Sequence, residues 1–478
     1  MKQYDSDRNA VDWLKEISNK KINGKSIIER LTFMDEDKEV SIWWWMDSWL
    51  YYCNSFGKAP IREIIHSINT GKPIKEYKKR RGTSLYISMK PIIRKIYWRF
   101  IKKNNKEKNK LLFLSFIPYE EGKEQYMEDI YNKFENKIIM DCPHRVGFEL
   151  KKLKEKVKKE GKQVDCIESY MKIDYKKVIT IIKSIYRKFR ELLIEYEFIY
   201  NNKNISIDVI YIFAEYFKSR FESHLIQYFT YKNMINRLEP SIIVSPLDSD
   251  VEMRQLKVLC EDKNIPIIGM QHGTIGYCPD SVHLKSEMEG DFPCPIPTKT
   301  LVWSESNKNF LIKHGNYPED KVIVTGNSRY DIFNDYKVKD EGYILLCTNK
   351  MSDEDKRKII TNACVYAKEQ NKELIIKPHP GEYDTNLHVE IAKLFDNCYI
   401  VSRNSNTFEL LKNCSLLIST ISTVLYEAKI LNKPVKLISL GDLKDYLTEK
   451  EIDDFNYKND GKATKKIIEV IRNELIQK

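Results

Sequence analysis

The sequence predicts an α/β protein of two domains, each built around a parallel sheet. With 478 residues, the chain is longer than one ordinary hydrophobic core supports. From Leu111 onward, short apolar runs alternate with segments of helical length, an order typical of parallel, doubly wound sheets. Two of these runs end in a histidine, His272 and His379. A polar residue at the carboxyl end of a parallel strand lies where such sheets bind ligands.

The first 110 residues show no clear alternation of strands and helices, and we expect them to add helices to the N-terminal domain. They include an aromatic run, 42–52, with four tryptophans. This run is too short to span a membrane and contains Asp47. A large aromatic stripe is more often core than an anchor at a lipid interface, so we predict that it is buried, with interfacial anchoring as the alternative.

A basic segment, 75–110, holds fourteen Lys or Arg residues against Glu76 and Glu107, whereas the whole chain has a net charge of +11. After Pro91, apolar residues such as Ile96 alternate with basic residues such as Arg94, which predicts a basic amphipathic helix. Docking on an anionic membrane surface and a solvated surface helix are equally compatible with this pattern. No nucleic-acid-binding module accompanies the charge, so nucleic acid is not an expected partner.

The elements of the first domain follow in order. Its expected strands are 111–117, 241–245, 265–270, 299–303 and 321–326. Helices are expected from Lys123, through a Lys- and Tyr-rich region at about 145–238, and at 251–262 and 306–314. The polar segment 330–342 is the expected linker. The N-terminal domain is therefore predicted to span 1–333.

A second α/β series predicts a C-terminal domain, 334–478. Its expected strands are 343–347, 373–377, 398–401, 415–419 and 434–438. Its expected helices are 353–370, 386–395, 407–411 and 424–431. The ten cysteines of the chain include no Cys-x-x-Cys pair, and no signal peptide is recognised. We therefore expect reduced thiols in a cytoplasmic protein, peripheral on the inner face of the membrane if the basic segment docks there.

The loop after strand 265–270 contains the first candidate catalytic residue. His272 stands beside Gly273, whose backbone can turn tightly next to the imidazole. Such a histidine is suited to act as a general base or to donate a hydrogen bond to a phosphate. Asp248 or Asp250, after the preceding strand, could orient this histidine or act as the base, although capping of the following helix explains at least one of them equally well.

Two motifs of the second domain offer groups for an anion. Lys377, His379 and Pro380 form a Lys-Pro-His-Pro turn, in which prolines hold a cation and an imidazole rigidly. A helix start after strand 415–419 supplies hydroxyls beside free backbone N–H groups, and an ordinary N-cap is the alternative interpretation. The hydroxyl residues are Ser419, Thr420, Ser422 and Thr423. Glu427, one turn later, could reach a ribose.

These motifs, with the Val-Thr-Gly-Asn-Ser-Arg-Tyr-Asp stretch at 324–331, resemble bacterial surface-polysaccharide transferases of the GT-B fold. The chain is similar to the capsule-type sialyl- and Kdo-transferases and to the CDP-glycerol glycerophosphotransferases. The resemblance implies two Rossmann-like domains facing across a cleft, with the acceptor on the N-terminal side. It also implies that His379-Pro380 and either Ser419-Thr420 or Ser422-Thr423 bind the CMP portion of a donor. Gln271, Gly273 and Asn327 are expected to support the site loops.

The resemblance predicts an inverting transferase that needs no cofactor and no metal, moving a sugar from a nucleotide donor to a glycan or glycolipid acceptor. The Asp248-Ser249-Asp250 spacing formally matches an Asp-x-Asp metal clamp, but we interpret it as a helix cap and a turn. The sialyltransferases place their base in an acidic pair before glycine, and Glu121 in Glu-Glu-Gly is the literal match, so the base is either His272 or a carboxylate. Three alternatives remain: a glycerophosphotransferase, a non-hydrolysing nucleotide-sugar epimerase and a non-enzymatic membrane-associated assembly protein.

Overall fold

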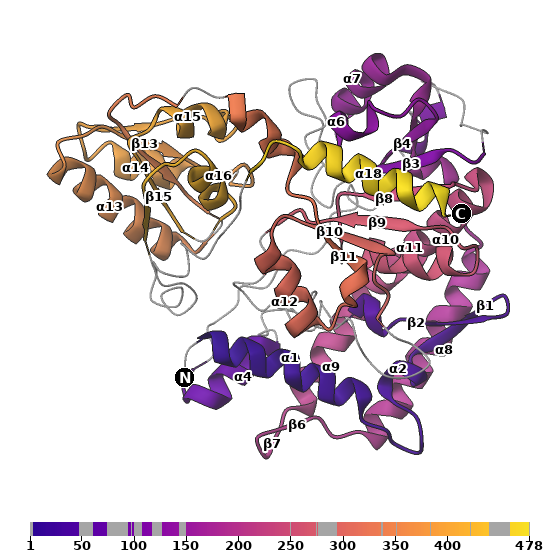
Figure 1. Ribbon diagram of the computed structural model, residues 1–478. Coiled ribbons are helices and arrows are strands. Elements are labelled where there is room, and N and C mark those ends of the chain that lie inside the picture. The colour runs from indigo at the N-terminus through magenta and orange to yellow at the C-terminus, as the bar shows by residue number, and fades with distance from the viewer. Residues whose placement is uncertain are drawn as a thin grey trace. The chain divides into compact units, whose positions relative to one another are not determined.

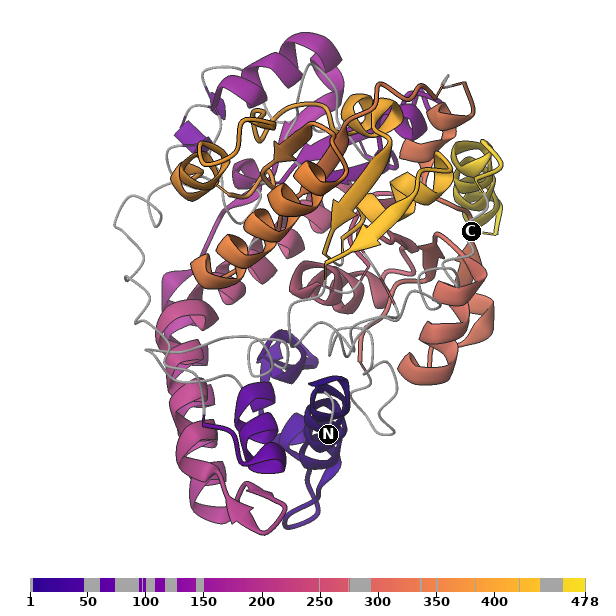
Figure 2. The same cartoon turned by 90° about the vertical axis from the view of Figure 1, so that its left-hand side faces the viewer.

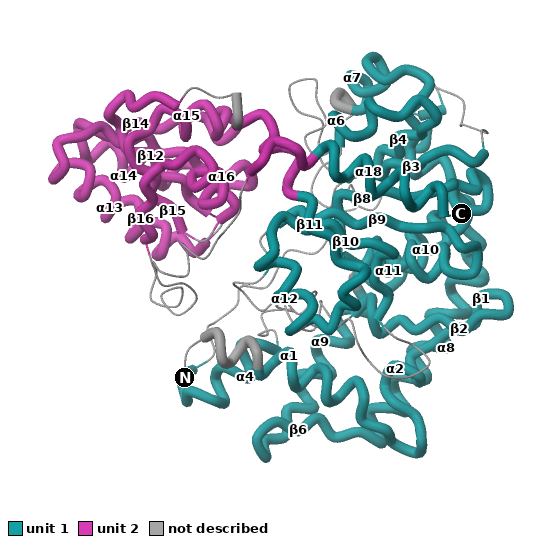
Figure 3. The backbone as a smooth tube through the Cα atoms, in the orientation of Figure 1, with its two compact units in different colours: residues 1, 3–325, 464–478 teal, residues 2, 326–463 magenta. Residues whose placement is uncertain are grey.

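The structure, a computed structural model, describes two compact units. The described residues are 3–46, 61–73, 94–96, 98–99, 108–116, 127–142, 150–248, 250–273, 275, 294–335, 338–349, 351–382, 384–420, 422–438 and 459–477. The first unit contains residues 3–325 together with 464–478, and the second contains 326–463 (Figure 3). The boundary expected between 333 and 334 therefore lies between 325 and 326, and the last helix belongs to the first unit.

A parallel sheet of seven strands, in the order β11-β10-β9-β8-β3-β4-β5, forms the centre of the first unit (Figure 1). The strands are β3 (Leu111–Ser115), β4 (Lys137–Asp141), β5 (Val164–Cys166), β8 (Ile242–Ser245), β9 (Ile267–Met270), β10 (Lys299–Val302) and β11 (Val322–Val324). Strands β4 and β5 are absent from the prediction. β5 has only three residues and lies in a Lys-rich stretch that reads as helix.

Each face of this sheet carries its own apolar cluster, because successive strand residues point to opposite faces. On β3, Leu112 and Leu114 belong to one cluster, whereas Leu111 and Phe113 belong to the other. Helix α18 (Ala463–Ile476) completes the second cluster with Ile467, Ile468 and Ile471. This packing explains why the end of the chain belongs to the first unit.

Helices and hairpins surround the sheet of the first unit. The helices are α1 (Gln3–Asn19), α2 (Ile27–Arg30), α4 (Ile61–Thr70), α6 (Glu128–Tyr131), α7 (Leu150–Glu160), α8 (Tyr175–Glu195), α9 (Ser206–Tyr216), α10 (Glu222–Leu238), α11 (Val251–Glu261) and α12 (Glu305–Gly315). The hairpins pair β1 (Thr32–Asp35) with β2 (Lys38–Ser41) and β6 (Ile199–Tyr200) with β7 (Lys203–Asn204). Short 3₁₀ turns are η1 (Gly161–Gln163), η2 (Ile167–Tyr170) and η4 (Glu319–Lys321), and η3 (Phe217–Phe221) is a π-helical turn.

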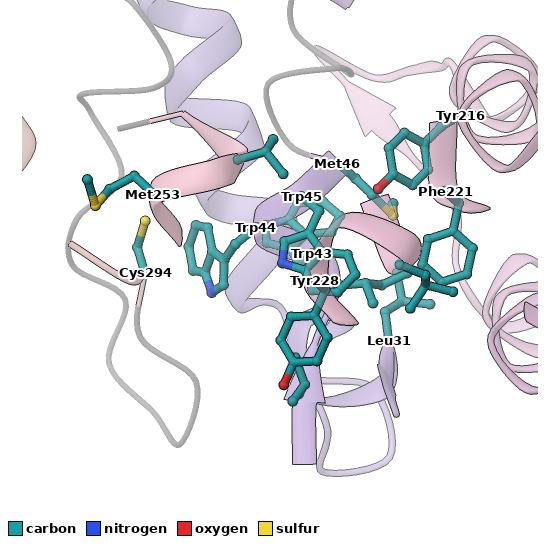
Figure 4. Packing of buried hydrophobic residues seen from close by; sticks show 14 of the residues in the cluster. Leu31, Trp43, Trp44, Trp45, Met46, Tyr216, Phe221, Tyr228, Met253 and Cys294 are labelled. Carbon is teal, nitrogen blue, oxygen red and sulfur yellow. The ribbon is translucent and has the colours of Figure 1, made fainter. Parts of the chain in front are cut away.

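The described tryptophans of the aromatic run lie in the core. Trp43, Trp44 and Trp45 are each at most 2% exposed, and Figure 4 shows them packed among side chains of several helices. Trp45 lies 5.5 Å from Tyr228 between ring centroids. The predicted core position is therefore confirmed for these three residues, and 47–52 lies outside the described part of the chain.

Most of the basic segment, 75–110, lies outside the described residues, but Arg94 corrects one expectation. Its guanidinium is buried and pairs with Asp141 Oδ2 at 2.5 Å and Glu168 Oε1 at 2.7 Å. Ile96, expected on the apolar face, is 50% exposed, and Trp98 is fully buried. Two carboxylates near the ends of β4 and β5 compensate the desolvation of Arg94, so its predicted solvent-facing position is wrong.

The second unit contains five parallel strands in the order β14-β13-β12-β15-β16. The strands are β12 (Ile344–Cys347), β13 (Leu374–Lys377), β14 (Cys398–Ile400), β15 (Leu416–Ser419) and β16 (Val435–Leu437). The helices are α13 (Asp353–Glu369), α14 (Asn386–Ala392), α15 (Thr407–Asn413) and α16 (Val424–Ile430). Figure 2 shows the long helix α13 along this sheet. Each unit thus holds one parallel sheet covered by helices, as the predicted α/β fold class requires.

The segment expected as a linker, 330–342, begins as part of the second unit. A 3₁₀ helix, η5, covers Ser328–Asp335. Tyr330 and Phe333 within it are at most 5% exposed and stack with ring centroids 5.4 Å apart. The linker prediction is therefore wrong for 330–335. It failed because the residues around these two aromatics are polar, so the segment lacks a clear apolar pattern in the sequence.

Candidate functional site

The second unit has a point where the strand order of its sheet reverses. From β12 the chain adds β13 and β14 on one side, and it then adds β15 and β16 on the other. Ligands of open α/β sheets bind outside the carboxyl ends of the strands at such a switch point. Cys347 and Ser419 are paired in register as the last residues of β12 and β15. Thr348, Asn349 and Thr420 follow them directly and so mark the expected ligand position.

Polar side chains cross this switch point. Asn349 Nδ2 donates to Thr420 Oγ1 at 2.8 Å. Ser419 is fully buried, and its hydroxyl donates to the Cys347 carbonyl at 3.1 Å. The hydroxyl proton of Ser419 is therefore used within the sheet, which leaves Thr420 as the better placed of this predicted pair to meet a ligand. Asn349 was absent from the predicted site, although its place after a strand is a signal that could have identified it.

Lys377 provides a positive charge next to the switch point. It ends β13, its side chain is 4% exposed, and its Nζ donates to the Arg403 carbonyl at 3.2 Å. The Arg403 guanidinium in turn donates to the Pro380 carbonyl at 2.5 Å. The loop after β14 is thereby fastened to the Lys-Pro-His-Pro turn, and Arg403 becomes a second cation of the site that the sequence did not indicate.

The His379 ring is held in one orientation. Its Nδ1 accepts a hydrogen bond from the Gly381 backbone N–H at 3.0 Å. When the imidazole is neutral, its proton must then lie on Nε2. The side chain is half-buried rather than enclosed. His379 can therefore present an Nε2–H donor, the kind of group that the sequence analysis assigned to a phosphate.

A buried carboxylate, Glu382, lies behind this turn and was not among the predicted site residues. Its Oε2 accepts from Thr348 Oγ1 at 2.6 Å and from the His379 backbone N–H at 2.9 Å, and its Oε1 lies 3.1 Å from Lys356 Nζ. These interactions, with one from His388, outweigh desolvation and lower the pKa of Glu382 to about 2. Glu382 is therefore ionised at neutral pH, and only the fold reveals its partners.

The remaining predicted donor-site residues lie in helix α16 and directly before it. Glu427 is 5% exposed, and burial raises the pKa of its carboxyl to about 7, although Arg329, Lys377 and a hydrogen bond from Tyr330 act in the opposite direction. Thr423 caps the helix without a side-chain hydrogen bond, and Ser422 Oγ accepts weakly from the Val424 N–H at 3.5 Å. The helix has only seven residues, so we assign no anion site to its N-terminus.

In the first unit, Asp248 and His272 come together. They follow the neighbouring parallel strands β8 and β9, and Asp248 Oδ1 lies 3.4 Å from His272 Nδ1. The Asp248 side chain is 1% exposed, whereas that of His272 is 41% exposed. A buried carboxylate behind an accessible imidazole favours a proton on Nδ1 and leaves Nε2 to accept one. The strand order of this sheet also reverses beside β8, between β8 and β3.

Gln271 connects the histidine loop with the end of β10. Its amide nitrogen donates to the Gly273 carbonyl at 2.8 Å, and its amide oxygen accepts from the Trp303 N–H at 2.8 Å. The Gln271 backbone carbonyl also accepts from the Trp303 indole at 3.0 Å. Asn327 belongs to the second unit instead, where its side chain accepts from the Arg329 N–H at 3.1 Å.

Three further positions named in the sequence analysis are Glu121, Ser249 and Asp250. Glu121 lies outside the described part of the chain, as does Ser249. Asp250 occupies the N-cap position of α11, with no side-chain capping bond. Within the described ranges, no three His, Cys, Asp or Glu side chains gather in a metal-binding arrangement, and no helix has both the length and the apolar character to cross a membrane.

Comparison with known proteins gives little information on activity. No protein-family model matches the chain. An uncharacterized protein of Methanocaldococcus jannaschii is 28% identical over 179 residues, which cover 35% of this chain and 31% of that protein. The chain thus aligns with less than a third of this relative.

Several solved structures have a partly similar fold. The UDP-GlcNAc 2-epimerase of Neisseria meningitidis, bound to UDP-GlcNAc, is 15% identical with a TM-score of 0.46, over 78% of this chain and 100% of the epimerase. A glycosyltransferase of Rickettsia africae is 14% identical with a TM-score of 0.39, over 77% and 94%. The wall teichoic acid polymerase TagF is 11% identical with a TM-score of 0.41, over 83% and 99%. Since every TM-score is below 0.5, we draw no conclusion about activity from them.

Proposed function

We propose that this protein is an inverting, metal-independent glycosyltransferase that uses a nucleotide-activated sugar, with CMP-linked nonulosonic acids or Kdo as the preferred donor class. The observation that carries the proposal is the switch point of the second unit. Lys377 ends β13 and Thr420 follows β15, the two strands that pair with β12 on either side, and the His379 turn follows the same strand as Lys377. A buried cation, a hydroxyl and an Nε2–H donor are suitable ligands for the phosphate of such a donor.

In this proposal the Asp248–His272 pair of the first unit acts on the acceptor. His272 Nε2 takes the proton of the acceptor hydroxyl, and Asp248 stabilises the resulting imidazolium. The acceptor oxygen forms a bond to the anomeric carbon from the face opposite the leaving group, as the bond from that carbon to the phosphate oxygen breaks. The leaving phosphate keeps the bonding electrons, and Lys377 and His379 stabilise its charge.

The proposal defines the acceptor by its chemical class. A hydroxyl of a surface glycan or glycolipid is the expected nucleophile, because the resemblance carried by the His-Pro and Ser-Thr motifs is to transferases that build such polymers. Attachment to an anionic membrane through 75–110 remains a prediction for the basic residues of that segment. Arg94 is excluded from that surface because its charge is already paired inside the first unit.

The test is nucleotide binding by the wild-type chain and two alanine variants. CMP, CDP, UDP and GDP are compared by thermal shift, since a ligand at 100 times its dissociation constant stabilises a protein by about 2.7 kcal/mol. We expect CMP to raise the melting temperature in the presence of EDTA, with loss of the effect in His379→Ala and retention in His272→Ala. Stabilisation by UDP alone, or dependence on a divalent cation, would contradict the proposal.

A further inference from the structure

We infer that Glu382 is a positioning residue that fixes the His379 imidazole in its Nε2–H form, facing the donor phosphate. The identity of the ligand rests on the proposed function, whereas the effect on the imidazole rests on the geometry of the turn alone. Glu382 does not itself contact the ligand in this scheme. It acts through His379 and through the end of β12.

The first step is the closed turn between His379 and Glu382. The Glu382 backbone N–H donates to the His379 carbonyl at 2.8 Å, and the Glu382 carboxylate accepts from the His379 N–H at 2.9 Å. These two bonds hold both ends of the turn. Gly381, between them, is thereby placed with its N–H 3.0 Å from His379 Nδ1. The carboxylate therefore sets the position of the donor that selects the tautomer.

The second step is that the site needs a carboxylate rather than any polar group. Thr348 donates its only hydroxyl proton to Glu382 at 2.6 Å, so its oxygen must accept from His388 Nε2, which lies 3.1 Å away. Lys356 Nζ contacts the other carboxylate oxygen at 3.1 Å. In Glu382→Gln, the side-chain NH₂ group would face either the Thr348 hydroxyl or Lys356 Nζ. Both of these groups are donors, so one of them would lose its acceptor inside the protein.

The third step connects this network with the switch point. Thr348 directly precedes Asn349, whose amide donates to Thr420. Glu382 thus supports the His379 turn and the β12 end at the same time. Its side chain is 3% exposed and that of His388 is fully buried. The Glu382–His388 part of the network is therefore shielded from solvent, which strengthens its hydrogen bonds.

The test compares Glu382→Gln with Glu390→Gln, the same change at an exposed glutamate of α14 that pairs with Arg357 at the surface. Long-range ¹H–¹⁵N spectra of the histidine side chains report the tautomer, and the His379 signals are assigned by their loss in His379→Ala. We expect Glu382→Gln to convert His379 to a mixture of tautomers and to weaken CMP binding about tenfold. Glu390→Gln should change neither.

A double-mutant cycle separates positioning from a general loss of stability. The residual CMP affinity of His379→Ala is measured at CMP concentrations well above those of the thermal-shift comparison, and if Glu382 acts through His379, adding Glu382→Gln should weaken this residual affinity by less than about twofold. An equal loss in both backgrounds, or an unchanged His379 tautomer in Glu382→Gln, would overturn the inference. If Glu382→Gln does not fold, Glu382→Asp, which keeps the charge but withdraws the carboxylate, must produce the same tautomer change.

The tautomer measurement requires no ligand. It supports or overturns the role of Glu382 even if the wild-type chain binds none of the four nucleotides. Failure to bind any of them would contradict the proposed function alone.

Discussion

Glu427 carries a carboxyl group whose burial opposes its ionisation more strongly than its neighbours favour it. Burial raises its pKa from 4.5 to about 7 in the folded chain. Between these values the folded state therefore holds more protons than the unfolded state. The stabilisation that comes from the protonated carboxyl is complete below the unfolded pKa and is lost as the pH rises through the folded pKa. Sequence reasoning placed Glu427 near a ribose but gave no indication of this protonation.

We expect Glu427→Gln, which imitates the protonated carboxyl, to remove this contribution to pH dependence. Relative to the variant, the wild-type free energy of unfolding should fall by an amount on the order of 3 kcal/mol between about pH 5 and pH 8. Urea unfolding across this range provides the measurement, with Glu390→Gln as a control that should follow the wild type. A difference between wild type and Glu427→Gln that stays constant with pH would exclude the raised pKa.

At the scale of elements, β9 and the loop after β8 approach each other so closely that only glycine fits at position 269. A Cβ added to Gly269 would lie 2.7 Å from Pro297 Cγ and 3.0 Å from the Asp248 Cα. The residue that carries the carboxylate behind His272 therefore rests directly on the backbone of the next strand. This contact explains how two neighbouring strands bring Asp248 and His272 together.

Gly269→Ala should destabilise the protein by about 1–3 kcal/mol, because the added methyl group overpacks a well-filled contact. Gly273→Ala is the matched control, since a Cβ there meets nothing within 4 Å. Chemical denaturation measures both. Equal stability of the two variants would mean that the loop after β8 can move aside without a loss of free energy of unfolding. The contact with Gly269 would then not fix the position of Asp248.

The sequence predicted those elements whose apolar runs are bounded by turns and followed by polar residues. Strands β9 and β13 are of this kind, so the positions of His272 and His379 could be predicted. Strand β5 could not be predicted, because three residues between Lys-rich helices produce no periodic pattern of apolar residues. The role of Glu382 could not be predicted either. Its hydrogen-bond and ion-pair partners come from the end of β12, from α13 and from α14, which approach one another only in the folded chain.

At the scale of the whole molecule, the first unit is built from two separate stretches of chain. α18 covers one face of its sheet, with Ile467 and Ile471 at most 1% exposed. Lys299 Nζ of β10 lies 4.0 Å from Glu474 of the same helix. The boundary between the units could not be predicted because nothing in the sequence of α18 distinguishes it from the helices of the second series.

Deleting 464–478 should destabilise the first unit by several kcal/mol, because burial of each isoleucine side chain contributes about 1.5–3 kcal/mol. Hydrogen exchange should therefore accelerate in β3 and β4, while β12 and β13 of the second unit keep their protection. A chain shortened only by residues 477–478 is the control. Unchanged exchange in β3 after the longer deletion would show that α18 does not complete this core.

The chain enters and leaves the second unit at adjacent points. Asp331 accepts a hydrogen bond from the Ala463 N–H at 2.9 Å, and the Asn459 side chain donates to the Tyr330 carbonyl. During synthesis, every strand of the second unit has emerged before the helix that closes the first unit. Because domains tend to fold as units while the chain grows, the unit made second can mature first. The first unit must keep an exposed apolar face until residues 464–478 have left the ribosome.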